Sequence, residues 1–215
     1  SILYALHLAN ESIQSRKTAI LVEGYMDAIA AHQFGYTNVV ASMGTALTDQ
    51  QVSHLKSLAT NFILALDPDM AGQEATLRSL ESSWRVIGHQ MSTRQHHSIG
   101  ALYQRKPINL RIAALDQGLD PDKLIRENPK EWERLTEKAV PLIEYLIPAM
   151  VSRFDLTTPN GKAQVAEVIL PLIESAEFLE QEKYLLQLAA ALEVSEELAQ
   201  LLGATLDVTG DPKPR

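Results

Sequence analysis

The stretch LVEGYMDAIAAHQFG, residues 21–35, begins as an apolar strand and continues as a helix. Between the two it places Glu23, Gly24 and Asp27 where the helix should begin. Helix capping alone does not account for a glutamate followed by a glycine at the end of a buried strand. In an open parallel sheet, ligands bind beyond the carboxyl ends of the strands, where loops lead into helices. The stretch therefore predicts a polar site at a strand end.

The segments around this stretch alternate between strand and helix patterns up to about residue 128. Short apolar runs predict four strands, at residues 18–22, 38–42, 61–66 and 108–115. Helical spacing and helix-start signals, including Thr48 as an N-cap and Pro121 in a first turn, predict helices at residues 2–14, 25–34, 49–59, 71–87 and 121–128. Because each strand is a continuous apolar run, we expect an α/β domain with a parallel sheet covered on both faces.

The pattern changes after residue 128, where only helical segments follow. Residues 130–154, 155–175, 177–192 and 195–202 have helical spacing, and no strand-period segment is found among them. We therefore expect two parts, an α/β domain at residues 1–128 and an all-helical domain at residues 129–206. The last residues, 207–215, are expected to form a flexible tail.

Composition excludes several classes of protein. The chain has 215 residues, of which 46% are apolar and 21% charged, as in ordinary globular proteins. It contains no cysteine, which excludes disulfides and thiolate chemistry. No charged-then-apolar leader and no apolar run of about 18 residues is present, so a cytoplasmic location without a membrane partner is expected. The net charge of −8 argues against a basic nucleic-acid-binding surface over the whole chain.

One segment departs from this acidity. Residues 82–115 contain no Asp or Glu and carry five Lys and Arg, so the rest of the chain has a net charge of −13. Residues 88–107 have no helix or strand period and are expected to be an insertion, either a plain surface loop or a polyanion contact through Arg94, Arg105 and Lys106. A preceding helix of this length would end about 25 Å from where it starts, which predicts contact away from the strand ends. Three histidines in the insertion lack cysteine or carboxylate neighbours, so zinc is not expected.

Carboxylates also follow the third and fourth predicted strands. Asp67 and Asp69 stand in LALDPDMAG, and Asp120 and Asp122 stand in GLDPDKL. Carboxylates gathered at one rim repel each other, and a hard divalent cation such as Mg²⁺ or Mn²⁺ relieves that repulsion. Each aspartate can also be a helix N-cap or turn former, an alternative that fits Asp120 and Asp122 best. Capping does not explain Glu23, Asp67 and Asp69 jointly.

The same residues carry a family resemblance. VEGYMDAIAAHQFGYTNVVASMGTALT, residues 22–48, and LALDPDMAGQEAT, residues 64–76, resemble the Toprim domain of DnaG-type bacterial primases. DLTTPNGKAQ, residues 155–164, resembles the helical subdomain that follows Toprim in those enzymes. The resemblance implies a Toprim-type parallel sheet flanked by helices, followed by an all-helical subdomain. The Glu-Gly-Tyr-Met-Asp motif separates primases from topoisomerases and recombination mediators.

The resemblance implies an enzyme of DNA replication, a DNA-templated RNA polymerase that makes short primers by nucleotidyl transfer from ribonucleoside triphosphates on a single-stranded DNA template. It implies two or more Mg²⁺ or Mn²⁺ ions bound at Glu23, Asp67 and Asp69, and also at Asp120 or Asp122. Asp27 and Gly24 are expected to support this site. Gly44 and Thr45 are expected either to offer backbone N–H groups to a phosphate or to form a plain strand-to-helix turn.

The chain also departs from the family pattern. Met70 follows the second aspartate where family members often have arginine. An N-terminal zinc-binding domain, the basic half of the polymerase region and a helicase-binding C-terminal domain are not recognisable. We therefore expect a fragment of a larger protein that meets the replicative helicase through regions absent from it.

Two other classes remain open. The first is a Toprim nuclease or topoisomerase, which requires a hydrolytic partner residue or a tyrosine nucleophile; Tyr25 lies inside the metal motif and is a poor nucleophile candidate. The second is a non-catalytic docking module whose helical half binds a replication partner.

Overall fold

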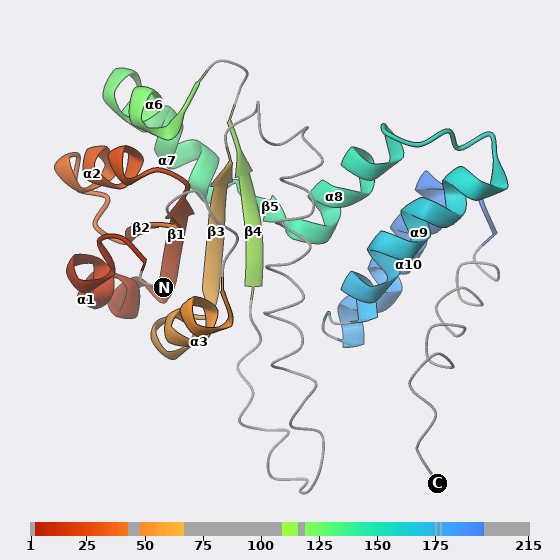
Figure 1. The fold of residues 1–215 in the computed structure, drawn as a ribbon, viewed down its shortest axis with the longest axis horizontal. Coiled ribbons are helices and arrows are strands. Elements are labelled where there is room, and N and C mark those ends of the chain that lie inside the picture. The colour runs from red at the N-terminus through yellow and green to blue at the C-terminus, as the bar shows by residue number, and fades with distance from the viewer. Residues whose placement is uncertain are drawn as a thin grey trace, which may run out of the picture. The chain divides into compact units, whose positions relative to one another are not determined.

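The computed structural model describes residues 3–42, 48–66, 109–115, 119–174, 176 and 178–195. The chain divides into two compact units, Ser1–Leu142 and Ile143–Arg215. The first unit holds a five-stranded sheet with helices around it, and the second is built from helices (Figure 1). None of the helices in the described part of the chain has the length and apolarity needed to span a bilayer.

The sheet of the first unit has the strand order β2-β1-β3-β4-β5. Its first four strands run parallel and confirm the four predicted strands: β1 Thr18–Val22, β2 Val39–Ala41, β3 Asn61–Leu66 and β4 Asn109–Ala114. Because β1 and β3 lie at the centre, both of their faces must be covered by apolar side chains. Their uninterrupted apolar sequences meet that requirement.

A fifth strand was not predicted. β5, Val140–Pro141, pairs antiparallel with β4, with Ile112 opposite Val140 and Arg111 opposite Pro141. The expectation that only helices follow residue 128 is therefore wrong, and the sheet is mixed. Two residues are too few to show a strand period, and proline is tolerated on an edge strand because a missing N–H there costs no ladder hydrogen bond.

The helices of the first unit follow the predicted order. They are α1 Leu6–Arg16, α2 Tyr25–Gln33, α3 Asp49–Leu58, α6 Pro121–Glu127 and α7 Pro129–Glu137. Thr48 caps α3 as predicted: its Oγ1 accepts the Gln51 N–H at 3.3 Å, and Gln51 Oε1 accepts the Thr48 N–H at 2.9 Å. Pro121 is in the first turn of α6, also as predicted. The helix predicted at residues 71–87 lies outside the described residues.

Helix α1 begins later than its apolar spacing suggested. The residues before it make sheet-like contacts instead, because Tyr4 forms an isolated antiparallel bridge with Ala41, at the end of β2. The Tyr4 N–H donates to Ala41 O at 3.0 Å, and the Ala41 N–H donates to Tyr4 O at 3.2 Å. The bridge brings the first described residues to the carboxyl end of the sheet.

The core covers both faces of the sheet. On one face, strand residues such as Ile20 and Ile63 pack with Ala28 of α2, Ile125 of α6 and the fully buried Trp132 of α7. The alternate strand residues, which point to the other face, are also buried: Ala19, Leu21, Phe62, Leu64, Leu110 and Ile112. This arrangement confirms the prediction of a sheet covered on both sides.

The first unit extends to Leu142, beyond the change of pattern at residue 128. Helix α7 contributes Trp132 to the core of the sheet domain, and β5 completes the sheet. Burial of a large indole and a strand pairing thus tie residues 129–142 to the sheet, although their sequence pattern is helical.

In the described part of the second unit, every regular element is a helix. These are α8 Leu142–Val151, α9 Pro159–Glu174 and α10 Phe178–Ala191. Helices α9 and α10 pack together, and their buried residues include Ile169, Ile173 and Leu188. Lys183 Nζ of α10 lies 2.6 Å from Glu144 Oε1 of α8. The all-helical character predicted for this part is confirmed over these residues.

Candidate active site

The carboxyl ends of β1, β3 and β4 lie side by side and form the edge that we call the rim. The register pairs Leu21 of β1 with Leu64 of β3, and Leu66 of β3 with Ala114 of β4. Continued by two residues, the same register puts Glu23 level with Leu66, the residue before Asp67. Helices α2 and α6 lie at this end of the sheet, toward which the arrows point in Figure 1. The strand ends that precede the predicted carboxylates are therefore neighbours.

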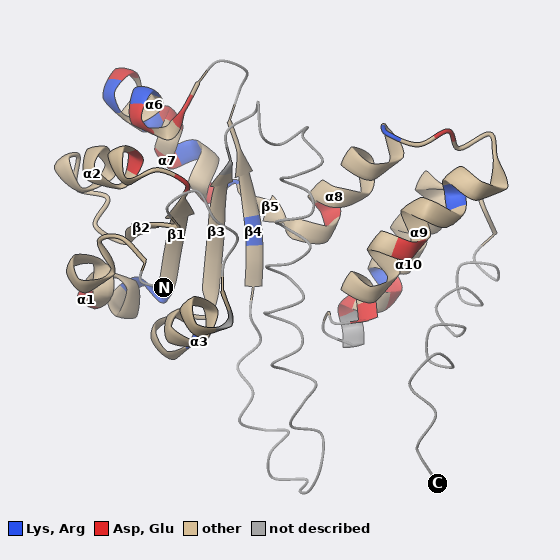
Figure 2. Ribbon diagram, in the orientation of Figure 1, with Lys and Arg blue, Asp and Glu red and all other residues tan. Residues whose placement is uncertain are grey.

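Glu23 is one of the predicted metal ligands that the structure describes, and it lies at the β1 side of the rim. It follows directly after β1, is half-buried and stands just before the N-terminus of α2. Figure 2 shows acidic residues at the end of β1, at the start of α2 and in the segment that enters α6. The positive end of the α2 dipole favours a carboxylate at this position.

Several predicted site residues fall outside the described part of the chain. They are the second and third predicted ligands, the two phosphate-contact residues and the three basic residues of the insertion: Asp67, Asp69, Gly44, Thr45, Arg94, Arg105 and Lys106. Their roles remain predictions from the sequence.

Gly24 and Asp27 form a tight turn at the start of α2. Gly24 is the N-cap, and Oδ2 of Asp27 accepts the Gly24 N–H at 3.0 Å. A Cβ at position 24 would lie 2.9 Å from the same Oδ2, closer than real Cβ contacts. The glycine is therefore needed for close approach of a carboxylate, not for an unusual φ, which is −94°. This geometry gives a physical reason for the Glu-Gly-x-x-Asp spacing.

The other oxygen of Asp27 reaches a segment far away in sequence. Its Oδ1 accepts the backbone N–H of Asp122, in the first turn of α6, at 3.1 Å. The half-buried carboxylate thus joins the N-termini of α2 and α6, the two helices that leave the rim. Through these two hydrogen bonds Asp27 links Gly24, the residue after Glu23, to the first turn of α6; its supporting role at a metal site stays a prediction.

The pKa of Asp27 is raised above its ordinary value. Burial is the main cause, and the negative charges of Asp120 and Asp122 add to it, while the hydrogen bonds from Gly24 and Asp122 act in the opposite direction. The two other aspartates thus disfavour the charged form of Asp27, in the same direction as burial.

Asp120 has the capping role that the sequence also allowed, whereas Asp122 lies in the first turn of α6. Asp120 is the N-cap of α6, and its Oδ1 accepts the Lys123 N–H at 2.7 Å. The Asp122 carboxylate forms an ion pair with Arg126, one turn along the same helix. Arg126 had no place in the sequence prediction, although its i,i+4 spacing from Asp122 signals such a pair.

The chemistry of the rim fits a hard divalent cation in part. Glu23 offers carboxylate oxygens, which Mg²⁺ and Mn²⁺ prefer, at the end of β1. Within the described residues, no group of three or more His, Asp or Glu side chains is arranged to hold a metal. Asp67 and Asp69, which the sequence predicts as further ligands, lie outside the described residues.

Comparison with known proteins adds independent observations. The Toprim domain family matches residues 17–97, and the family described as the DnaB-helicase binding domain of primase matches residues 142–197. The DNA primase of Clostridium acetobutylicum is 31% identical over 211 residues, which are 97% of this chain and 32% of the relative. The DNA primase of Escherichia coli K12 is 34% identical over 172 residues, 80% of this chain and 27% of the relative.

Solved structures agree with these matches. The Escherichia coli primase catalytic core superimposes with a TM-score of 0.69 and 32% identity, covering 90% of this chain and 57% of that one. A DNA primase domain from Pseudomonas aeruginosa gives a TM-score of 0.69 and 26% identity, covering 94% and 59%. The chain is a relative of the DnaG-type bacterial primases.

These matches correct one expectation. The helicase-binding region was expected to be absent, yet the match to the DnaB-helicase binding domain covers the helices of the second unit. Apolar helical spacing is shared by many helical domains, so the pattern alone did not identify this one. The chain spans about a third of the curated primases that it matches.

Proposed function

We propose that this chain is part of the catalytic core of a bacterial DNA primase, a DNA-templated RNA polymerase that makes short RNA primers. The observation that carries the proposal is the rim, where Glu23 stands level with the end of β3, directly before Asp67 and Asp69. The likeness to primase catalytic cores supports the same activity, and a related DnaG primase catalytic domain is described as bound to single-stranded DNA, at 30% identity and a TM-score of 0.68.

Glu23, Asp67 and Asp69 would hold two or more Mg²⁺ or Mn²⁺ ions, with Asp120 or Asp122 as a further contact. Such ions supply positive charge to the phosphates and lower the pKa of an attacking hydroxyl. The protein's own part is positional: β1 holds the Glu23 carboxylate, and Asp27 fixes the α2 N-terminus behind it. Gly44 and Thr45 would offer backbone N–H groups to a phosphate of the ribonucleoside triphosphate.

Metal binding at the rim can be measured directly. Mn²⁺ should raise the melting temperature of the chain, because a ligand that binds only the folded state stabilises it. Glu23→Gln keeps the shape of the side chain but removes its charge, and should abolish the rise. Glu127→Gln, which alters an exposed carboxylate of α6, is the matched control and should keep it. An equal rise in wild type and Glu23→Gln would place the metal elsewhere.

Activity distinguishes the enzyme from the other two classes. In the full-length protein, Asp67→Asn and Asp69→Asn should abolish primer synthesis on single-stranded DNA while leaving the fold intact. A Toprim nuclease or topoisomerase would instead cleave or relax DNA without incorporating ribonucleotides, and a docking module would do neither. Primer synthesis at wild-type rates in either variant would exclude that residue as a ligand.

A second proposed function is docking to the replicative helicase through residues 142–197. The match to the DnaB-helicase binding domain of primase favours it. Leu186 of α10 is 41% exposed and offers an apolar contact. Leu186→Ala should weaken binding to a DnaB-type helicase, measured by surface plasmon resonance, while Leu8→Ala, at an exposed leucine of the first unit, should not. Equal affinities for both variants would remove Leu186 from the interface.

The basic insertion is proposed to contact nucleic acid away from the metals. Charge reversal at Arg94, Arg105 and Lys106 should weaken DNA binding by the full-length protein and flatten its salt dependence, because fewer phosphates would be neutralised. Metal binding should not change. Unaltered DNA affinity across a salt series would identify the insertion as a solvated loop.

A further inference from the structure

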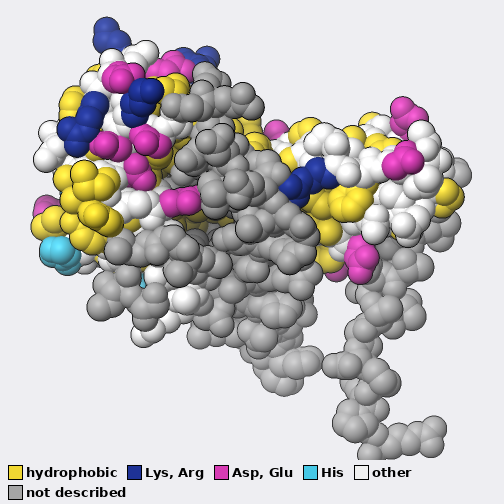
Figure 3. Space-filling model, turned by 45° about the horizontal axis from the view of Figure 1, so that its top comes forward, with side chains coloured by type: hydrophobic (Ala, Val, Ile, Leu, Met, Phe, Trp, Pro, Cys, Tyr) yellow, Lys and Arg dark blue, Asp and Glu magenta, His cyan; other side chains and the backbone are white. Residues whose placement is uncertain are grey.

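Large apolar side chains are exposed where α1 and α2 begin. Tyr4 is 39% exposed, Tyr25 50% and Met26 46%. The two tyrosine rings contact each other edge to face, with centroids 6.1 Å apart and planes inclined by 62°. Figure 3 shows a hydrophobic patch over this part of the molecule, with acidic side chains beside it. Exposed apolar patches rimmed by polar groups usually mark binding sites.

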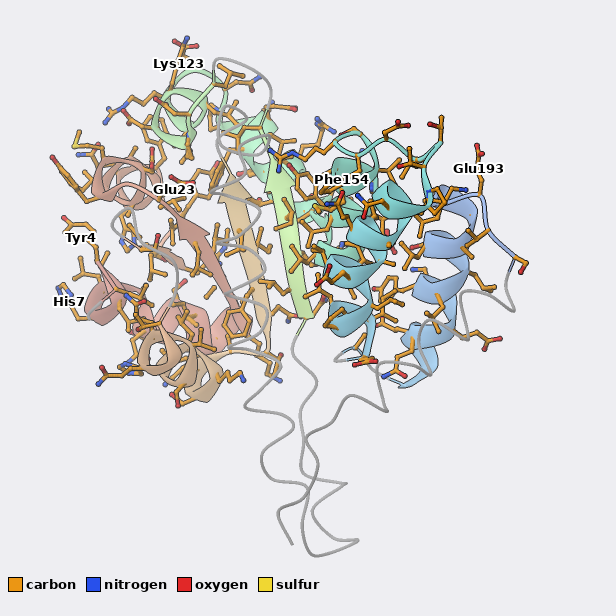
Figure 4. All side chains as sticks on the ribbon, turned by 45° about the vertical axis from the view of Figure 1, so that its right-hand side comes forward. Tyr4, His7, Glu23, Lys123, Phe154 and Glu193 are labelled. Carbon is orange, nitrogen blue, oxygen red and sulfur yellow. The ribbon has the colours of Figure 1, made fainter. Side chains whose placement is uncertain are left out.

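The two tyrosines, Tyr4 and Tyr25, are positioned by elements at the carboxyl end of the sheet. Tyr25 is the first residue of α2, two residues after Glu23, and Tyr4 is held at the end of β2 by its bridge to Ala41. In Figure 4, Glu23 falls between Lys123 of α6 and Tyr4. Because Tyr25 follows Glu23 by two residues and its ring contacts Tyr4, we expect a ligand that reaches Glu23 with one end to meet the tyrosines with the other.

The chemistry of the two rings selects a flat partner. An edge-to-face pair covers only one face of one ring, and both tyrosines keep exposed surface, 39% for Tyr4 and 50% for Tyr25, on which a flat group can stack. Nucleobases stack on exposed tyrosines in many nucleic-acid-binding proteins, whatever the base, because every base has a π-face. In a nucleotide, the negative phosphates lie several ångströms from the base. The base can therefore stack on the tyrosines while the phosphates lie near Glu23, the predicted metal ligand.

We propose that Tyr25 and Tyr4 form a stacking platform for a nucleobase whose phosphates lie at the rim. This inference rests on the proposed function, since it assumes that nucleotides reach Glu23. The base can come from a ribonucleoside triphosphate or from a single-stranded DNA template, and the ring chemistry that receives it is the same.

Calorimetric titration of the 215-residue chain with ATP in the presence of Mn²⁺ tests the platform. Tyr25→Ala and Tyr4→Ala should each weaken ATP binding about 5-fold to 150-fold, the usual range for loss of one aromatic stacking partner. Tyr25→Phe keeps the ring and should bind within about twofold of wild type. Phe34→Ala removes a comparably exposed aromatic, 44% exposed, at the other end of α2 and should have no effect.

Ligands without a base separate stacking from phosphate contact. Inorganic triphosphate with Mn²⁺ should bind wild type and Tyr25→Ala equally. A thymidine oligonucleotide and an abasic strand of the same length test the DNA source: if the platform receives template, only the thymidine strand loses affinity in Tyr25→Ala. Loss confined to ATP would assign the platform to the incoming nucleotide.

Photocrosslinking provides a readout that does not depend on how the alanine variants fold. Iodouridine triphosphate and a strand containing iododeoxyuridine should crosslink to Tyr25 or Tyr4, as mapped by mass spectrometry. Crosslinks elsewhere, unchanged affinity of Tyr25→Ala for every probe, or equal losses for triphosphate and ATP would overturn the platform. Failure of the proposed function would give a different result. Mn²⁺ would bind equally to wild type and Glu23→Gln, while ATP would still lose affinity in Tyr25→Ala.

Discussion

The carboxylate of Asp27 accepts the backbone N–H of Asp122, a residue 95 positions later in the chain, at 3.1 Å. Its other oxygen holds the Gly24 N–H at 3.0 Å. One side chain therefore accepts a backbone N–H at the start of each of two helices, α2 and α6, which begin at the same edge of the sheet. The positions of Glu23 and of the Asp120–Asp122 segment are coupled through this single residue.

Asp27→Asn should destabilise the first unit. An amide has one acceptor oxygen, so one of the two N–H groups would face an NH₂ group and lose its partner, at a cost of about 1–3 kcal/mol in the free energy of unfolding. Urea denaturation measures the loss, with Glu127→Gln of α6 as a control that should unfold like wild type. A denaturation midpoint for Asp27→Asn equal to that of wild type would show that the two hydrogen bonds of Asp27 do not stabilise the fold.

Gly24→Ala should destabilise through the same carboxylate. The new Cβ would meet Oδ2 of Asp27 at 2.9 Å, and the carboxylate can move away only by giving up its hydrogen bonds. We expect a loss of about 1–3 kcal/mol, typical of overpacking. In an Asp27→Ala background the clash is gone, so the same substitution should cost clearly less. Additive losses in this double-mutant cycle would argue against direct contact as the cause.

Gly161→Ala should unfold the second unit at lower denaturant concentration. Gly161 is buried in the first turn of α9, and a Cβ there would lie 2.1 Å from the backbone oxygen of Asp155. The oxygen belongs to the main chain, which cannot rotate away as a side chain can, so the loss should exceed that of Gly24→Ala. Asn160→Ala, at the exposed neighbouring position, is the control. The changes can be followed by circular dichroism of the helices during urea titration.

Tyr36 should make the stability of the first unit sensitive to alkaline pH. Its hydroxyl lies 3.0 Å from Glu133 Oε1 and 3.1 Å from Pro129 O, and burial together with the Glu133 charge raises its pKa from 10.0 to about 12. The folded state therefore keeps its proton where the unfolded state loses it. The resulting stability is fully present below pH 10.0 and is lost as the pH rises through about 12.

Tyr36→Phe removes this titration. Melting temperatures of wild type and variant should differ by a constant amount below the ordinary tyrosine pKa and should converge between that value and the raised one. Taking the difference between the two proteins removes the contribution of the remaining tyrosines. Parallel pH profiles through this range would show that the Tyr36 pKa is not raised in the folded protein.

The strands and most helices of the first unit follow from local sequence. Uninterrupted apolar runs suit strands whose two faces are both covered, as in a parallel sheet flanked by helices. Thr48 and Pro121 mark helix starts because threonine suits an N-cap and proline suits a first turn. The position of Glu23 at a strand end follows from the same pattern. The motifs at residues 22–48 and 64–76 also indicated the resemblance to primases, because a motif can be read from the sequence alone.

Only the tertiary structure showed the features that depend on contacts between residues distant in sequence. No period marks a two-residue strand, so β5 exists only because β4 offers it a free edge. The burial of Trp132 against the sheet draws α7 into the first unit. The hydrogen bond between Asp27 and Asp122 and the contact between Tyr4 and Tyr25 likewise join segments that local propensity treats as independent. Hydrogen bonds and ring contacts need atoms within a few ångströms, and only folding brings these residues that close.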